Sequence, residues 1–203
     1  MVQNEMVAVD WTPVVRAHEQ CTRKIVQRTA NAILKKTYLA DNPPKKSFSF
    51  GSAKDIDALY TLAAYLFVFE QHDLCCDVCS LCNHVEFTGD FTLWSYIRSL
   101  RCMQIAVLSM KGEPEKADVI FQKLKEHEMP EENRIRVWKT TKQRALGHGE
   151  AYREKKSSST RYAIMGTSMI CLEFLIMGYL PEEHEIMKEW MDKIFIFLRA
   201  EEK

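Results

Sequence analysis

Turn-forming residues are scarce in this chain, and their scarcity restricts the possible folds more than any other feature of the sequence. The 203 residues include only 7 Gly and 6 Pro, and the pairs Asn-Gly and Asp-Gly do not occur. Those pairs favour the two-residue turns of β-hairpins, so a sheet made of many hairpins is not expected. Long helices joined by short breaks are predicted instead, in a chain long enough to form one good core.

Apolar residues recur at helical spacing through the first half of the chain. A helix is predicted over Pro13–Leu39, and the loop 41–52 ends it because two prolines, a glycine and serines cluster there. Ser52 and Asp73 are expected to be the N-caps of the next two helices, since their side chains can accept a backbone N–H. Another helix is predicted over about 93–110.

Helical patterns continue through the second half of the chain. Gly112 and Pro114 form a helix-turn-helix signal, because glycine favours helix ends and proline favours the first turn. The helix after 128–133 is expected to falter at 147–149 and to end in a polar loop at 155–160. The last two helices are predicted at about 161–177 and 181–200. About eight helices are therefore expected in one all-α domain that spans residues 1–203, with a flexible start at 1–11.

The segment 112–130, GEPEKADVIFQKLKEHEMP, resembles the second half of a tetratricopeptide (TPR) repeat. That pattern has a glycine and a turn, a small residue that packs on the preceding helix, a Phe four residues on and a closing Pro. The matching residues are Gly112, Ala117, Phe121 and Pro130. The resemblance implies antiparallel helical hairpins stacked in a TPR-like right-handed array, a scaffold that binds proteins and has no chemistry of its own. It also implies that Phe121 is buried between hairpins.

A cluster of cysteines lies in the segment LCCDVCSLCNH at 74–84. On one helix over 74–86, Cys75, Cys79 and Cys82 fall beside the apolar stripe that contains Leu81. The opposite side carries polar residues, among them Asp77, Ser80 and His84. Because a free cysteine behaves as a small hydrophobe, these three thiols and Leu81 are predicted to be buried, and Asp77 and Ser80 to lie outside.

The same cysteines support an alternative hypothesis of a thiol-dependent metal-binding or redox protein. The spacing Cys75-x-x-x-Cys79-x-x-Cys82 matches the three-cysteine motif of radical enzymes that hold an iron–sulfur cluster. In those proteins the motif lies in a loop after a strand, and no strand is predicted here. A zinc site needs four convergent ligands, and no second Cys-x-x-Cys pair supplies them. Buried structural thiols, with no cofactor, are the favoured interpretation.

Several observations point to a cytoplasmic, non-catalytic protein. The N-terminus, MVQNEMVAVD, lacks the pattern of a signal peptide, and seven cysteines at uneven spacing are typical of reduced thiols. The apolar stretch 162–180 approaches the length of a membrane span, but Glu173 at its centre favours a buried helix. Motifs for nucleophilic catalysis, phosphate binding or zinc proteases do not occur, which favours a binding function over an enzyme.

Charge is unevenly distributed although the net charge is zero. The segment 134–161 contains nine basic and two acidic residues, whereas 47–133 contains seven basic and fourteen acidic residues. One hypothesis is that this basic block is a solvated helix face balanced by the acidic segment. The other is that it binds an acidic peptide or partner protein, with nucleic acid a less supported ligand and the chain itself monomeric or dimeric. The predicted partner-binding residues are Arg136, Trp138, Lys139, Lys142 and Tyr152.

Overall fold

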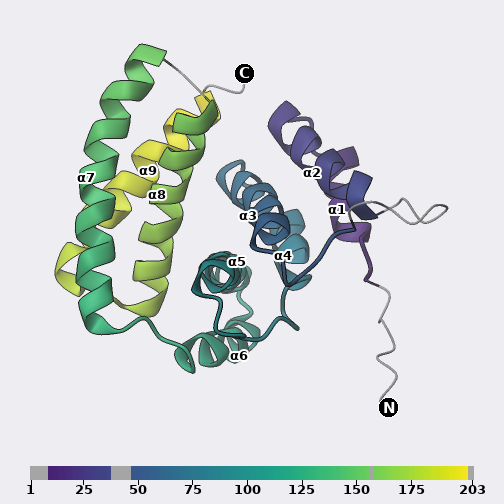
Figure 1. Cartoon of the computed structure of the whole chain (residues 1–203), viewed down its shortest axis with the longest axis horizontal. Coiled ribbons are helices and arrows are strands. Elements are labelled where there is room, and N and C mark those ends of the chain that lie inside the picture. The colour runs from purple at the N-terminus through teal and green to yellow at the C-terminus, as the bar shows by residue number, and fades with distance from the viewer. Residues whose placement is uncertain (1–8, 38–46, 156–157, 201–203) are drawn as a thin grey trace.

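The chain is all-α, as the sequence predicts. A computed structural model describes residues 9–37, 47–155 and 158–200, without the side chains of 148–155. Within these ranges it has nine α-helices, one 3-10 helix and no strand (Figure 1). The α-helices are α1 (Thr12–Gln20), α2 (Lys24–Thr37), α3 (Ala53–Val68), α4 (His72–Ser80), α5 (Phe91–Met110), α6 (Pro114–Lys125), α7 (Glu131–Lys155), α8 (Ser158–Met177) and α9 (His184–Ala200). The 3-10 helix is η1 (Pro181–Glu183).

Helix α5 lies at the centre of the molecule. It packs against α3 and α4 on one side, against α6 after a sharp turn, and against α8 on another side. Helix α8 in turn packs between α7 and α9, and α9 also touches α3. Figure 1 shows α7, α8 and α9 as a group of long helices on the left, with α1 and α2 at the opposite edge. From α1 to α6, each helix packs against the next one in the chain. The order then changes, because α8 and not α7 packs against α5.

Local sequence signals begin and end the central helices. Ser52 accepts a hydrogen bond from the backbone N–H of Asp55 (3.4 Å) at the start of α3, which confirms the predicted cap. Asp90 caps α5 by accepting from the backbone N–H of Leu93 (3.0 Å). Gly112 adopts a positive φ of 73° just after α5, a conformation that costs a glycine little, and Pro114 opens α6 as predicted.

The N-terminal helical region differs from the prediction because it is broken in two. Cys21 adopts an extended conformation, so α1 and α2 replace the single helix predicted over Pro13–Leu39. The break lets α1 fold back so that Val14 and Ala17 are buried, and α1 packs against α4. One straight helix could not place those residues and the buried face of α2 on the same core. The predicted loop 41–52 lies partly outside the described residues, and its described part, 47–52, is not helical.

The thiol-rich helix is shorter than predicted. It begins at His72, with Gln71 rather than Asp73 at the N-cap, and it ends at Ser80. The chain after it leaves helical conformation, and the carbonyl of Val85 accepts a hydrogen bond from the buried guanidinium of Arg101 (2.7 Å). A carbonyl inside a helix already accepts a backbone N–H, so ending the helix frees an acceptor for this buried charge.

Helix α7 is longer than predicted. It runs through 147–149 without the expected interruption, although glycine in a helix interior costs about 1 kcal/mol relative to alanine. The predicted loop 155–160 is also wrong in extent, because α7 reaches Lys155 and α8 begins at Ser158. Packing of α7 along α8 compensates for the weak local preference.

The predicted core is confirmed at most positions. The apolar residues that recur at helical spacing in α3 and α5 are buried, among them Leu59, Phe67 and Leu100. Leu81 and Phe121 are exceptions, because both are only half-buried. Leu81 lies in the turn after α4, and α6 buries Ala117, Ile120 and Leu124 instead of Phe121. Of the two residues expected outside, Ser80 is exposed and Asp77 is half-buried beside Arg16 (2.8 Å).

These burial differences predict the ranking of two substitutions. Phe174 on α8 is fully buried, and Trp138 on α7 and Tyr179 after α8 contact its ring, so Phe174→Ala should lower the free energy of unfolding by about 3–5 kcal/mol. Phe121→Ala should cost less than half of that, because the ring is partly in water already. Urea denaturation followed by circular dichroism measures both values. Equal losses of unfolding free energy in the two variants would show that Phe121 is buried as deeply as Phe174.

Candidate functional site

Helix α7 carries the predicted basic block and exposes part of it. Arg136 is exposed and donates a hydrogen bond to the side-chain oxygen of Asn133 (2.8 Å), and Lys139 is exposed. The Lys142 ammonium lies 2.8 Å from a carboxylate oxygen of Glu183. That hydrogen bond is the main reason that the pKa of Glu183 lies below its usual range. The basic block is therefore balanced in part by the C-terminal region, not only by 47–133.

Trp138 is not the exposed anchor that the sequence predicts. Its side chain is only 2% exposed and packs against Phe174 and Trp190, with ring centroids 6.1 and 5.5 Å away. The helical period explains the difference, since Trp138 lies on the face of α7 that packs against α8. The side chain of Tyr152, the other predicted anchor, lies outside the described residues. Of the predicted partner-binding residues, Arg136, Lys139 and Lys142 remain accessible to different degrees.

Two adjoining hollows lie between α5 and α7. Their volumes are about 590 and 520 Å³, and both are lined by Arg98, Met129 and Val137. The basic block reaches each of them, because Arg136 lines the larger hollow and Arg144 lines the smaller. The hollows therefore meet at Arg98 and form one extended depression with basic residues on both sides.

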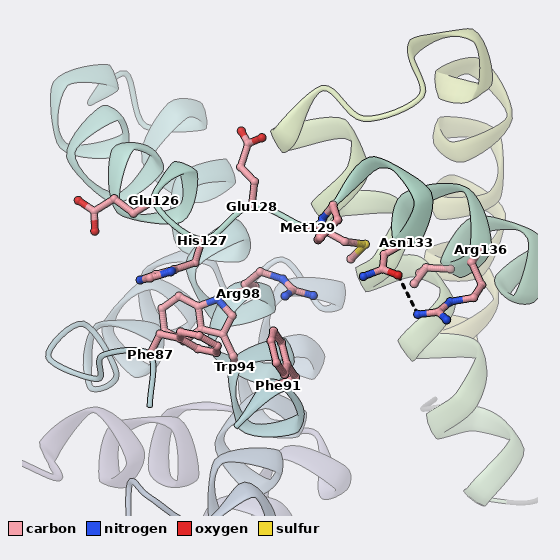
Figure 2. A pocket seen from close by; sticks show the side chains of 12 residues that line it. Phe87, Phe91, Trp94, Arg98, Glu126, His127, Glu128, Met129, Asn133 and Arg136 are labelled. Carbon is pink, nitrogen blue, oxygen red and sulfur yellow. Dashed lines mark hydrogen bonds between the residues drawn. The ribbon is translucent and has the colours of Figure 1, made fainter. Parts of the chain in front are cut away.

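The larger hollow is lined by aromatic rings, and we call it the aromatic hollow. Phe87, Phe91 and Trp94 supply its wall, with the ring of Phe87 5.2 Å from Phe91 and 5.5 Å from Trp94. Figure 2 shows these rings below the α6–α7 connection, with Arg98 beside them and Arg136 across the hollow. Phe91 is 73% exposed, so its ring is accessible at the edge of the hollow.

The smaller hollow, which we call the tyrosine hollow, is lined by α3 and α8 as well as by α5 and α7. Tyr60, Tyr96 and Tyr162 line it, and the hydroxyl of Tyr162 donates to a carboxylate oxygen of Asp57 (2.6 Å). Burial raises the pKa of Tyr60 and of Tyr162, and Asp57 adds to both shifts. Both phenols therefore stay protonated at neutral pH, and that of Tyr162 acts as a hydrogen-bond donor.

A buried ion pair separates the two hollows. The Nε of Arg98 on α5 donates to a carboxylate oxygen of Glu173 on α8 (2.7 Å), and the two side chains are 13% and 6% exposed. Burial raises the pKa of Glu173, while Arg98 opposes that shift. The terminal amino groups of Arg98 make no hydrogen bond to any described residue, so they are available to the hollows. This pair was not predicted from the sequence, although charges are few in both helices, with Arg98 and Arg101 in α5 and Arg161 and Glu173 in α8.

The three clustered thiols are buried, as predicted. Cys75, Cys79 and Cys82 are each at most 1% exposed. Burial raises the pKa of Cys82 to about 12 and that of Cys79 well above the ordinary value of 9.0. Metal binding and nucleophilic chemistry need the thiolate, which such an environment disfavours. Within the described part of the chain, His, Cys, Asp and Glu side chains form no group of three suited to hold a metal.

Helix α8 carries the apolar stretch that resembles a membrane span. Among the described residues it is the one helix that is long and apolar enough to cross a membrane, by length and composition. In this structure it packs between α7 and α9, and its buried Glu173 pairs with Arg98. These contacts are those of a core helix.

Comparison with known proteins gives a family but no activity. A model described as a family of unknown function (DUF6707) matches residues 8–161, a range that contains α1 to α7 and every residue that lines the aromatic hollow. No curated protein and no solved structure matches the chain.

The ion pair leads to a prediction about stability. Arg98→Met should lower the free energy of unfolding by about 3–5 kcal/mol, because it leaves the buried Glu173 carboxylate without its partner. The double variant Arg98→Met with Glu173→Leu should recover much of that loss, since neither charge is then buried. Urea denaturation of the three proteins measures the difference. A double variant as unstable as Arg98→Met would mean that packing, and not the ion pair, matters at this site.

The buried thiols lead to a prediction about pH. A raised pKa keeps Cys79 and Cys82 protonated in the folded chain at pH values where the unfolded chain has already lost these protons. Stability should therefore fall as pH rises above about 9, by roughly 1.4 kcal/mol per pH unit for each group, until the folded pKa is reached. The variant Cys79→Ala with Cys82→Ala should show a shallower fall in urea denaturation under reducing conditions. Parallel curves would contradict the assignment.

Proposed function

We propose that this chain, which belongs to the DUF6707 family, is a non-catalytic protein-interaction module that binds an acidic segment of a partner protein. The observation that carries the proposal is the extended depression between α5 and α7, in which exposed aromatic and basic side chains lie together. Surfaces that bind other proteins are enriched in aromatic residues and arginine.

The arrangement of the helices supports a scaffold role. Helix α3 packs against α4 and α5, and α5 packs against α6, which are the neighbour contacts expected of TPR-like hairpins. Helix α5, which precedes α6 in this pair, contributes Phe91, Trp94 and Arg98 to the aromatic hollow.

The chemistry of the depression supports binding rather than catalysis. The hydroxyl groups of Ser95 and Ser99 donate to backbone carbonyls (2.7 and 3.2 Å) and not to a side chain that could act as a base. Glu173 is held by Arg98, and Tyr162 donates to Asp57. A nucleophile activated by a neighbouring base, the usual sign of covalent catalysis, is therefore not assembled from these side chains. The seven cysteines are unpaired, which supports the proposal of a cytoplasmic location.

The proposal predicts the effect of reversing charges on α7. A fluorescein-labelled peptide that alternates leucine with glutamate should bind, and peptides of equal length with glutamine or lysine in place of glutamate should bind more weakly. The triple variant Arg136→Glu, Lys139→Glu and Lys142→Glu should lose binding of the glutamate peptide, because like charges then face it. Fluorescence anisotropy measures the affinity. Binding should also weaken with added salt, since exposed charges are screened beyond a Debye length of about 8 Å at physiological ionic strength.

A matched triple variant tests whether binding depends on the charges of α7 or only on the net charge of the chain. Lys24 and Lys35 on α2 and Lys54 on α3 are exposed, and none of them is among the residues that line either hollow. Reversing these three to Glu makes the same change in net charge and should leave most of the binding in place. Thermal melting must be similar for both triple variants. Equal loss of binding in both, or none in either, would refute a binding surface on α7.

A further inference from the structure

We infer that the aromatic hollow recognises one particular feature of the partner segment: a side-chain carboxylate directly beside a bulky apolar side chain. This inference rests on the proposed function and gives it a specific ligand chemistry. It depends on three observations, which are an exposed aromatic ring at the rim, hydrogen-bond donors without partners, and acidic side chains that are either paired or directed away.

The rim supplies the apolar contact. Phe91 is 73% exposed at the start of α5, and the ring of Phe87 beside it is half-buried. Met129 and Val137 continue this apolar surface on the other side of the hollow. A bulky apolar side chain placed among these groups would remove their exposed area from water, which is the main favourable contribution to such contacts.

The floor supplies donors for an anion. Trp94 is only 3% exposed, and its indole N–H makes no hydrogen bond to any described residue, although a buried donor normally has a partner. Arg98 uses its Nε for Glu173 and leaves its terminal amino groups available. Arg136, across the hollow in Figure 2, adds a second guanidinium. Guanidinium groups suit carboxylates, because two N–H groups can donate to the two oxygens in parallel.

The acidic residues near the hollow do not oppose this arrangement. Glu128 forms an ion pair with Lys125 and accepts a hydrogen bond from Arg134 (3.0 Å), and its pKa is lowered chiefly by Lys125. Figure 2 shows the carboxylates of Glu126 and Glu128 directed away from the side of the hollow where Arg98 and Arg136 lie. Since Glu173 already balances Arg98, Arg136 is the lining guanidinium without an acidic partner among the described residues, which favours a singly charged carboxylate over a doubly charged phosphate.

The binding groups are held in place before a ligand arrives. The guanidinium of Arg101 lies 5.0 Å from the ring of Trp94, and His127 contacts the same ring at 5.5 Å. Arg98 is fixed by Glu173. A site whose donors are already ordered loses little conformational entropy on binding, so these residues are suited to specific recognition.

The test pairs changes in the chain with changes in a peptide. Three fluorescein-labelled peptides of equal length carry Phe-Glu, Phe-Gln or Gly-Glu at the centre of an otherwise identical Ser/Gly sequence. Trp94→Phe removes the indole N–H and keeps an aromatic ring, whereas Phe91→Ser removes the exposed ring. Ile196→Ser, at a residue of α9 that is 67% exposed, is the matched control for the loss of an apolar group. Fluorescence anisotropy measures each affinity, and circular dichroism shows that each variant is folded.

Wild-type chain should bind the Phe-Glu peptide about tenfold more tightly than either other peptide, as expected for one charged hydrogen bond or one buried apolar side chain. Trp94→Phe should reduce the preference for Glu over Gln and keep the preference for Phe over Gly. Phe91→Ser should reduce the preference for Phe over Gly and keep the preference for Glu over Gln. Ile196→Ser should change neither preference. The double variant Arg98→Gln with Glu173→Gln, which leaves no unpaired charge, should also reduce the preference for Glu over Gln.

Failure of this inference is distinguishable from failure of the proposed function. If the glutamate–leucine peptide binds and the triple reversal on α7 abolishes its binding, the interaction module stands. If, in that case, the wild-type chain shows no preference for the Phe-Glu peptide over the other two, the aromatic hollow is not the recognition site. The same conclusion follows if the preference is unchanged in both Trp94→Phe and Phe91→Ser. If the glutamate–leucine peptide binds no better than the lysine peptide, the proposed function and this inference both fall.

Discussion

The contact between α5 and α8 is the interaction on which the rest of the structure depends, because it joins the stack that begins at α1 to the long helices α7 to α9. Most of that contact is apolar, but its polar centre is the ion pair of Arg98 and Glu173. A buried charge without a partner is costly, so each residue restricts where the other helix can lie. The pair thus sets the position of α8 on α5 and, through α8, the position of α7.

The two hollows are a consequence of this geometry. Helix α8 covers the middle of α5, whereas α7 lies farther out and is tied to α8 rather than to α5. The space left between α5 and α7 is lined by rings from the start of α5 on one side and by the basic block on the other. The arginine that stabilises the helix contact therefore also offers its remaining donors to the depression. Stability and the proposed binding share one side chain, as often occurs where a polar group lies at the edge of a core.

The thiols illustrate how a chemically suggestive motif can serve packing. Cys75, Cys79 and Cys82 lie in a motif whose spacing matches that of cluster-binding enzymes, yet each occupies a core position where a small apolar side chain allows helices to approach. Helix α4 ends at Ser80, so Cys82 lies in a turn, and it is still buried within the hydrophobic core. The spacing of the cysteines does not by itself distinguish a packing role from metal binding. The distinction depends on the low dielectric around the thiols, which disfavours the thiolate that a metal requires.

The sequence by itself determined the all-α class, the cap of α3 at Ser52, the sharp turn at Gly112 and Pro114, and the buried faces of α3 and α5, because these depend on local backbone preferences and on helical periodicity. Only the tertiary structure decided the break at Cys21, the continuous helix α7, the burial of Trp138 and the half-exposure of Phe121. It also decided that Arg98 faces Glu173 across 75 positions of the chain and that Phe91 borders a hollow. Periodicity shows which residues share a face of one helix, but which helix covers that face depends on contacts between distant segments. Those contacts bring the aromatic rings of α5 and the basic side chains of α7 to the same depression.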